Sequence, residues 1–330
     1  PILSVERLSV EFDVAADGNW PWIPKRKLTA VRDVSFEVSS QETLGLVGES
    51  GSGKTTLIRA IAGTVPLSSG RILWEGNDLA HFDRRSRRQV RRDMAMIFQD
   101  PLAALNPRMT AGQIIAEPIR THLPELSKAQ IVIRVGEMME KVGLLANLAN
   151  RYPHEFSGGQ CQRIGIARAL ILNPKLVICD EPVAALDVSV RAQVVNLLKE
   201  LQRELGLAMI FIAHDLSVIK HISTQIMVIY LGKIMEFASA NELLNHPTHP
   251  YTRALIASVP IPDPIEERAR PRVILSGDLP SPLEIPKGCV FESRCLEARK
   301  ECASIQPKLE LYQTGHQVAC PFQFTEAGIS

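Results

Sequence analysis

The chain has 330 residues, of which 45% are hydrophobic and 22% are charged, as in an ordinary globular protein of one large or two modest domains. With 37 basic and 36 acidic residues the net charge is +1, which gives no overall case for nucleic-acid binding. No stretch approaches the run of about 18 apolar residues that spans a membrane, and the first residues lack the features of a signal peptide. We therefore expect a protein of the cytosol or of the cytosolic side of a membrane.

The beginning of the chain predicts a small sheet and a loop. Apolar and polar residues alternate over residues 3–12 and 31–38, which indicates two strands. The intervening residues 13–27 contain Gly18, Pro21 and Pro24 and predict a loop that carries Trp20 and Trp22. One interpretation is that one of these indoles stacks on a nucleotide base. The other, equally strong, is packing over a local apolar patch.

Residues 48–55 read Gly-Glu-Ser-Gly-Ser-Gly-Lys-Thr, which is the spacing of a phosphate-binding loop. A buried strand is predicted before it, at 43–47, and a helix after it, at 56–62. In such a loop, backbone N–H groups and the helix N-terminus surround phosphates, Lys54 reaches them, and the Thr55 hydroxyl binds Mg²⁺. The candidate nucleotide-binding residues here are Gly48, Glu49, Ser50, Gly51, Ser52, Gly53, Lys54, Thr55 and Thr56.

The middle of the chain alternates between strands and helices, which predicts a mainly parallel α/β core. Six arginines between residues 84 and 92 are interpreted as a solvated helix face in preference to an anion or lipid-headgroup patch. The remaining pattern predicts strands at 71–74, 94–98, 176–179, 208–212 and 225–230, with helical stretches at 111–142, 157–172 and 188–205.

Polar residues that follow the predicted strands suit the chemistry of ATP hydrolysis. Asp180 and Glu181 end the apolar run at 176–179, and two carboxylates there are expected beside a cation. We predict that Asp180 holds Mg²⁺ and that Glu181 polarises the attacking water. Gln99 would contact the metal and the water, and His214 would bridge the water and the γ-phosphate. Either residue alone would be read as structural; the phosphate motifs reverse that reading.

A second anion site is predicted at Ser157-Gly158-Gly159-Gln160, at the start of a helix. One nucleotide does not need two such sites on one chain. Two chains packed head to tail would use both, because each would lend its Ser-Gly-Gly turn to the γ-phosphate bound by the other.

Taken in order, these motifs resemble the ATPase subunits of ABC transporters. The resemblance covers residues 1 to about 245 and rests on the phosphate loop, Gln99, residues 156–160, Asp180-Glu181, residues 185–187 and His214. The signature begins with Phe156 instead of the commoner leucine, ahead of the anion-binding atoms. The resemblance implies a P-loop NTPase fold with a RecA-like core, a small antiparallel β subdomain and an α-helical signature subdomain at about residues 100–172. It also implies that Asp187 lies at the dimer interface and that the Gln99 region touches the transmembrane subunits.

Further motifs resemble the oligopeptide/dipeptide importer branch of that family. They are Trp20-x-Trp22-x-Pro24, residues 101–108 (Pro-Leu-Ala-Ala-Leu-Asn-Pro-Arg), residues 151–156, and residues 249–255 (His-Pro-Tyr-Thr-Arg-Ala-Leu) ahead of a proline-rich tail. The branch implies a heterodimer with a second, D-type ATPase subunit, two integral-membrane permease subunits, and a periplasmic peptide-binding protein. It implies a peripheral position on the cytoplasmic face of a bacterial inner membrane and no nucleic acid. Importers of oligopeptides, dipeptides, murein peptides, glutathione and nickel share most of these motifs.

The composition changes near residue 245, where we place a boundary between an ATPase domain (1–245) and an irregular, proline-rich extension (246–330). The extension holds Cys289, Cys295, Cys302 and Cys320, whose spacing fits common zinc patterns poorly. Four thiolates suit an iron–sulfur cluster, and the branch resemblance implies one of the 4Fe–4S type. Zinc and unligated thiols are the alternatives.

Two other functions fit part of the sequence. Soluble ABC ATPases that act on nucleic acid or ribosomes usually carry two cassettes or a long coiled coil, and exporter motors commonly carry a fused membrane domain. Neither feature is present in this sequence, so we favour a peptide importer.

Overall fold

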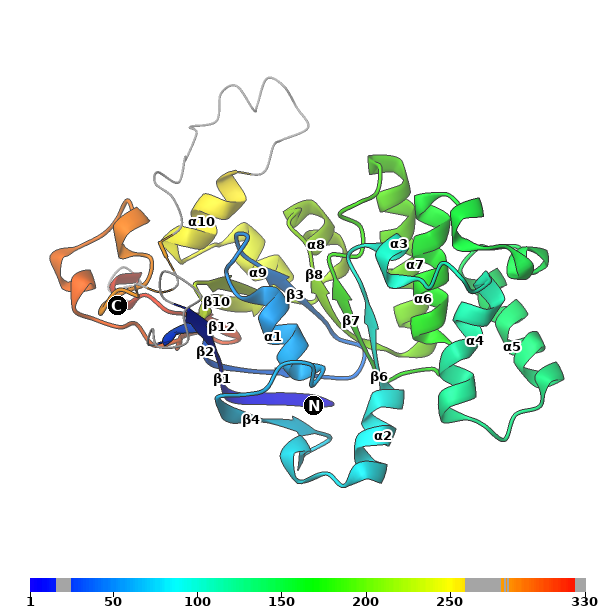
Figure 1. Ribbon diagram of the computed structural model, residues 1–330. Helices are drawn as coiled ribbons and strands as arrows, with labels where there is room; N and C mark the ends of the chain where they lie inside the picture. The colour runs from blue at the N-terminus through cyan, green and yellow to red at the C-terminus, as the bar shows by residue number, and fades with distance from the viewer. Residues whose placement is uncertain (16–24, 259–279, 282, 284, 324–330) are drawn as a thin grey trace, which may run out of the picture. The chain divides into compact units, whose positions relative to one another are not determined.

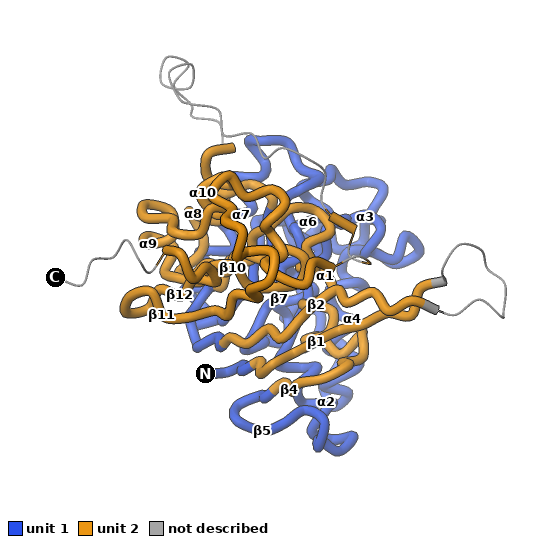
Figure 2. Tube along the Cα trace, turned by 90° about the vertical axis from the view of Figure 1, so that its left-hand side faces the viewer, with its two compact units in different colours: residues 1–4, 37–43, 73–213 blue, residues 5–36, 44–72, 214–330 orange. Residues whose placement is uncertain are grey.

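The computed structural model describes residues 1–15, 25–258, 280–281, 283 and 285–323. They divide into two compact units, shown in Figure 2. Unit 1 comprises residues 1–4, 37–43 and 73–213, and unit 2 comprises residues 5–36, 44–72 and 214 onward. We describe each unit by itself. Of the predicted loop at 13–27, residues 16–24 with Trp20 and Trp22 lie outside the described residues, and the flanking residues belong to strands instead.

Unit 1 is built on three parallel strands, which confirms the predicted α/β class. They are β6 (Met94–Ile97), β7 (Leu176–Asp180) and β8 (Ala208–Ile212), with β7 in the middle. Cys179 is in register with Ile97 on one side and Phe211 on the other. Every residue of β7 and β8 is buried, which explains why both strands read as continuous apolar runs.

The helices of unit 1 begin at residues that can cap them. Of these helices, α4 (Ala111–His122), α5 (Lys128–Lys141) and α6 (Gly158–Leu170) pack against one another (Figure 1). Thr110, Ser127 and Ser157 each form a capping box with the glutamine three residues later. The helical stretch predicted for 111–142 is two helices, separated at Pro124. The helices of unit 1 are α2 (Arg84–Asp93), α3 (Pro101–Ala104), α4 (Ala111–His122), α5 (Lys128–Lys141), α6 (Gly158–Leu170) and α7 (Val188–Leu205), with 3₁₀ turns at Leu79–His81, Ala146–Asn150 and Pro153–Glu155.

The arginine cluster lies on α2, where five of the six side chains are exposed and Arg92 is half-buried. Val90 and Asp93 are the buried residues of that helix. The cluster therefore lies mainly on the exposed face of the helix.

A small sheet combines two strands that precede the phosphate loop in the chain with two that follow it. Its strands follow the order β2 (Lys25–Val38), β1 (Leu3–Ala15), β4 (Ser69–Trp74) and β5 (Asn77–Asp78). The two long strands extend further toward residues 16–24 than the alternation predicted, and β5 pairs antiparallel with the end of β4.

In unit 2 a second set of strands positions the phosphate loop. β3 (Thr43–Val47) runs parallel to β9 (Gln225–Tyr230), which pairs antiparallel with β10 (Lys233–Ser239). The helices of this unit are α1 (Lys54–Ile61), α8 (Leu216–Ile222), α9 (Ala240–Asn245) and α10 (Pro250–Ala257). No helix within the described ranges of the chain has both the length and the apolar character needed to cross a membrane.

The C-terminal extension is less irregular than predicted. β12 (His316–Val318) pairs antiparallel with β10 and with β11 (Glu310–Gln313), so the extension adds strands to the sheet of unit 2. Short 3₁₀ turns occur at Glu292–Arg294, Lys300–Ala303 and Pro321–Gln323. The strands are short, and the proline-rich composition before them concealed the pairing.

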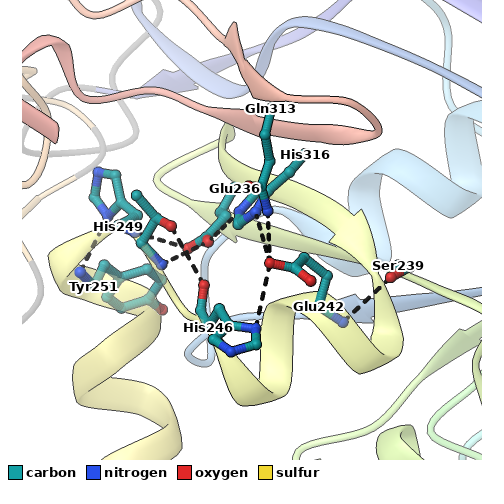
Figure 3. Close-up of polar contacts among 9 residues, drawn as sticks. Glu236, Ser239, Glu242, His246, His249, Tyr251, Gln313 and His316 are labelled. Carbon is teal, nitrogen blue, oxygen red and sulfur yellow. Dashed lines mark hydrogen bonds and ion pairs between the residues drawn. The ribbon is translucent and has the colours of Figure 1, made fainter. Parts of the chain in front are cut away.

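A buried carboxylate joins the extension to β10 (Figure 3). Glu236 accepts hydrogen bonds from the N–H groups of Thr248 (2.8 Å) and His249 (2.9 Å) and from His316 Nε2 (2.7 Å). His249 Nδ1 in turn accepts from the N–H of Tyr251, at 3.0 Å. Burial lowers the pKa of His249 to about 4, so the ring is neutral, as an acceptor nitrogen requires. Glu236 thus fixes the start of α10 and β12 together.

Candidate functional site

The phosphate loop lies between β3 and α1, and two of its glycines are required by close backbone approaches. A Cβ atom at Gly48 would lie 2.2 Å from the carbonyl oxygen of Ile229, and one at Gly53 would lie 2.3 Å from that of Ala30. Both glycines have positive φ, 156° and 102°. The loop is therefore held against β9 and β2, and its path excludes other residues at these positions.

We expect Gly48→Ala to destabilise the chain by about 2 kcal/mol more than Gly63→Ala, and to abolish Mg·ATP binding. Gly63 is the matched control because its φ is also positive (71°), yet a Cβ there would meet nothing within 4 Å. Chemical denaturation and nucleotide titration of both variants measure the effect. Equal losses in both variants would contradict the close approach at Ile229.

Lys54 is buried in the first turn of α1 and contacts the loop itself. Its Nζ donates to the carbonyl oxygens of Gly48 (2.7 Å) and Glu49 (2.8 Å) and to Ser52 Oγ (3.4 Å). No side chain among the described residues caps α1, whose N-cap is Gly53. An ammonium group and the N-terminal end of a helix together favour an anion at this loop.

In unit 1, Gln99 and the end of β7 meet. Asp180 and Glu181 are 5% and 7% exposed, and Gln99 Nε2 donates to Glu181 Oε2 at 3.0 Å. The backbone of Glu181 has a φ of 49°, an uncommon conformation for a side-chain-bearing residue. Such strain concentrates at functional positions, where the surrounding structure maintains it.

The signature turn is at the surface of unit 1. Ser157 Oγ accepts from the N–H of Gln160 (3.3 Å), and Gln160 Oε1 accepts from the N–H of Ser157 (2.9 Å). Ser157 and Gly158 are exposed, whereas a Cβ at Gly159 would lie 2.6 Å from Val190 of α7. Asp187, at the N-cap of α7, is also exposed. The helix end is thus shaped by its own capping box and accessible to another molecule.

Some of the predicted site residues belong to unit 1 and the others to unit 2. Unit 1 contains Gln99, residues 157–160, Asp180, Glu181 and Asp187; unit 2 contains the phosphate loop, including Thr55 and Thr56, and His214. The structure joins Gln99 to Glu181 and Lys54 to the phosphate loop. His214 is exposed, between β8 and α8.

The four cysteines of the extension line one cavity, together with His249, Phe291 and other side chains. The N–H of Cys289 donates to the carbonyl oxygen of Cys302, at 2.8 Å. Burial raises the pKa values of Cys289 and Cys320, and that of Cys295 to about 11, so these thiols are protonated near neutral pH. Across the described residues, no group of three or more His, Cys, Asp or Glu side chains is arranged to hold a metal ion.

Comparisons with known proteins identify the family. A model described as "ABC transporter" matches residues 31–184, and one described as "Oligopeptide/dipeptide transporter, C-terminal region" matches residues 235–302. The oligopeptide transport ATP-binding protein OppF of Salmonella typhimurium is 56% identical over 97% of this chain and 95% of its own length. The chain belongs to the ABC transporter family. It is an ATP-binding, ATP-hydrolysing subunit, which confirms the resemblance inferred from the motifs.

Other relatives and solved structures agree with this assignment. The putative oligopeptide transport ATP-binding protein YkfD of Bacillus subtilis is 50% identical over 97% of this chain and 95% of its own length. A dimeric, post-hydrolysis structure of the ATP-binding cassette MJ0796 with ADP and Pi superposes with a TM-score of 0.63, covering 72% of this chain and 98% of that one at 25% identity. CbiO1 of Clostridium perfringens has a TM-score of 0.62, with coverages of 74% and 91% and 26% identity. The cassette fold is therefore confirmed.

Sequence reasoning missed two residues that contact the phosphate loop. Tyr251 was noted only within a branch motif, and Arg294 was not singled out. Both contact Glu49, which lies 202 residues before Tyr251 and 245 residues before Arg294 in the chain. Nothing in the local sequence of either residue signals a contact over such a separation.

Proposed function

We propose that this cassette powers the import of oligopeptides across a bacterial inner membrane. The observation that carries the proposal is that the similarity to OppF extends over 97% of the chain, including the extension, and not only over the ATPase motifs. The chain would act from the cytoplasmic face as one of two different ATPase subunits, with a D-type partner. Two permease subunits and a periplasmic peptide-binding protein would complete the importer.

The proposed roles follow from the groups described above. The loop N–H groups and Lys54 bind the phosphates and stabilise charge on the transferring phosphoryl group, while Glu181 polarises the attacking water. Gln99 orients Glu181 and the water, and His214 holds the water near the γ-phosphate.

Mg²⁺ is the metal proposed for this reaction, and the donors fit it. Thr55, Gln99 and Asp180 offer hydroxyl, amide and carboxylate oxygens, which magnesium prefers. The buried carboxylate pair at the end of β7 is also of the kind that a cation stabilises. When bound, Mg²⁺ neutralises phosphate charge. We also propose that Trp20 or Trp22 stacks on the adenine.

The surface of unit 1 supports partners at two places. Residues 157–160 and Asp187 are proposed to contact the nucleotide and loop of the second ATPase subunit. Near Gln99, the apolar side chains of Phe98 and Leu102 are 44% and 55% exposed, which suits contact with a permease subunit. Closing of the heterodimer on ATP would then pull on the permeases through this region.

We propose that the extension begins at a domain boundary near residue 245 and that its four cysteines hold a 4Fe–4S cluster. Thiols that line one cavity are the donor set such a cluster uses, and it would cross-link an otherwise short-stranded segment. We expect anaerobically purified protein to carry about four iron and four sulfide ions per chain, and Cys295→Ser to lose them. Elemental analysis checks this. Stoichiometric zinc, or no metal, would contradict the proposal.

The importer proposal is tested by extracting the protein from its native membrane in mild detergent and identifying what co-purifies. Two distinct permease proteins and a second, non-identical ATPase are the expected result. The identities of the permeases would also narrow the cargo among the peptide, glutathione and nickel classes. A homodimer without membrane partners, or one that carries RNA or DNA, would contradict the proposal.

A further inference from the structure

Glu49, the second residue of the phosphate loop, is bound by the C-terminal segment of the chain. All the residues concerned lie in unit 2. The N–H of Glu49 donates to Tyr251 Oη at 2.9 Å, and its carboxylate Oε2 accepts from Arg294 Nη1 at 2.8 Å. Its carbonyl oxygen accepts from Lys54 Nζ (2.8 Å) and from the N–H of Ser52 (3.2 Å). The extension therefore orients the same residue whose carbonyl binds the phosphate-loop lysine.

The two groups that hold Glu49 are themselves fixed. Tyr230, Tyr251 and Phe291 are buried and form a cluster with ring centroids 4.7–5.3 Å apart, within the range favoured for aromatic pairs. Arg294 is also buried: its side chain is 7% exposed, against 26% for that of Glu49, and its Nη1 donates to Tyr230 Oη at 3.4 Å. Burial lowers the pKa of Arg294, but its hydrogen bonds to Glu49 and Tyr230 outweigh burial and raise it, so the guanidinium stays charged.

A carboxylate in a phosphate-binding loop needs such a partner. Its charge repels a polyphosphate, and the repulsion is strongest where little water screens it. A charge-assisted bond to a buried arginine neutralises the carboxylate and fixes its direction. Fixing a glycine-rich loop before binding also reduces the entropy lost when the ligand orders it.

We propose that Arg294 and Tyr251 are positioning residues for the ATPase: they hold the phosphate loop through Glu49 and set its affinity for the triphosphate. The C-terminal extension thus contributes directly to nucleotide binding in its own subunit. The inference rests on ATP binding at the phosphate loop and is independent of which cargo is imported.

The test uses the full-length chain and the dissociation constant of a fluorescent ATP analogue with Mg²⁺. We expect Arg294→Gln to raise this constant about tenfold, because Glu49 is left as an uncompensated charge. In Glu49→Gln/Arg294→Gln we expect recovery to within about threefold of wild type, because the repelling charge is removed as well. Arg253→Gln is the matched control, since Arg253 is an arginine of α10 paired with the exposed Glu297 at 2.8 Å. It should change the constant less than about twofold.

Recovery of ATP affinity in the double variant would show that Arg294 acts by neutralising the charge of Glu49. If Arg294 only supported the fold, removing the charge of Glu49 would not restore the affinity. An unchanged constant in Arg294→Gln, or a loss that the double variant does not recover, would overturn the proposal. If Arg294→Gln fails to fold, Tyr251→Phe decides. It keeps the aromatic cluster and removes only the acceptor for the Glu49 N–H, so unchanged affinity in that variant would overturn the proposal. A wild-type chain that bound no Mg·ATP would instead overturn the assignment of the nucleotide site.

Discussion

Glu181→Gln should bind Mg·ATP with the affinity of the wild type and hydrolyse it about 10²–10³-fold more slowly. The amide has the size of the carboxylate, and its oxygen can still accept the hydrogen bond that Gln99 donates at 3.0 Å. It cannot take a proton from the attacking water or polarise it as a carboxylate does. The uncommon backbone conformation of Glu181, with a φ of 49°, is also kept by glutamine.

Single-turnover release of phosphate, measured beside nucleotide binding, checks this prediction. Glu204→Gln is the matched control in the same unit, because Glu204 is a half-exposed carboxylate paired with Lys141 at 2.5 Å. Its turnover should equal that of the wild type. Rapid hydrolysis by Glu181→Gln would remove Glu181 from the catalytic role and shift attention to His214.

The elements that carry the ATPase motifs could be predicted because their signals are local. β7 and β8 are five-residue strands buried at every position; β8 is apolar throughout and β7 is apolar up to Asp180. The strand before the phosphate loop is likewise buried at all five positions. The signature helix spans Gly158–Leu170, close to the predicted 157–172, and it begins at a capping box between Ser157 and Gln160. In each case neighbouring residues determine the conformation, so one stretch of sequence suffices.

The extension could not be predicted in the same way, because contacts between distant residues determine its order. Composition predicted only a change near residue 245, and a strand of three residues, such as β12, has too few positions to show alternation. The position of β12 depends on the bond between Glu236 and His316, which are 80 residues apart in the chain. The contacts of Tyr251 and Arg294 with Glu49 join residues that are still further apart in the chain. Sequence pattern carries little information on such pairs.

Glu236→Gln should lower the free energy of unfolding by about 3 kcal/mol and the melting temperature by about 6–10 °C. Glu236 and His316 are both fully buried, and the carboxylate accepts from two backbone N–H groups as well as from His316 (Figure 3). An amide replaces one acceptor by a donor, so at least one of these buried groups loses its partner. The loss should fall on the attachment of α10 and β12 to β10.

Calorimetry of the full-length chain measures this loss, and Glu242→Gln provides the matched control. Glu242 lies beside the same histidine, at 3.9 Å from His316 Nδ1, but its side chain is 31% exposed, so its neutralisation should cost less than about 1 kcal/mol. A double-variant cycle with His316→Gln should be non-additive, because the two residues share one hydrogen bond. Additive losses, or equal losses at Glu236 and Glu242, would show that the buried pair does not join the extension to the sheet. Since the same extension supplies Tyr251 and Arg294, a strong effect at Glu236 should be accompanied by weaker ATP binding.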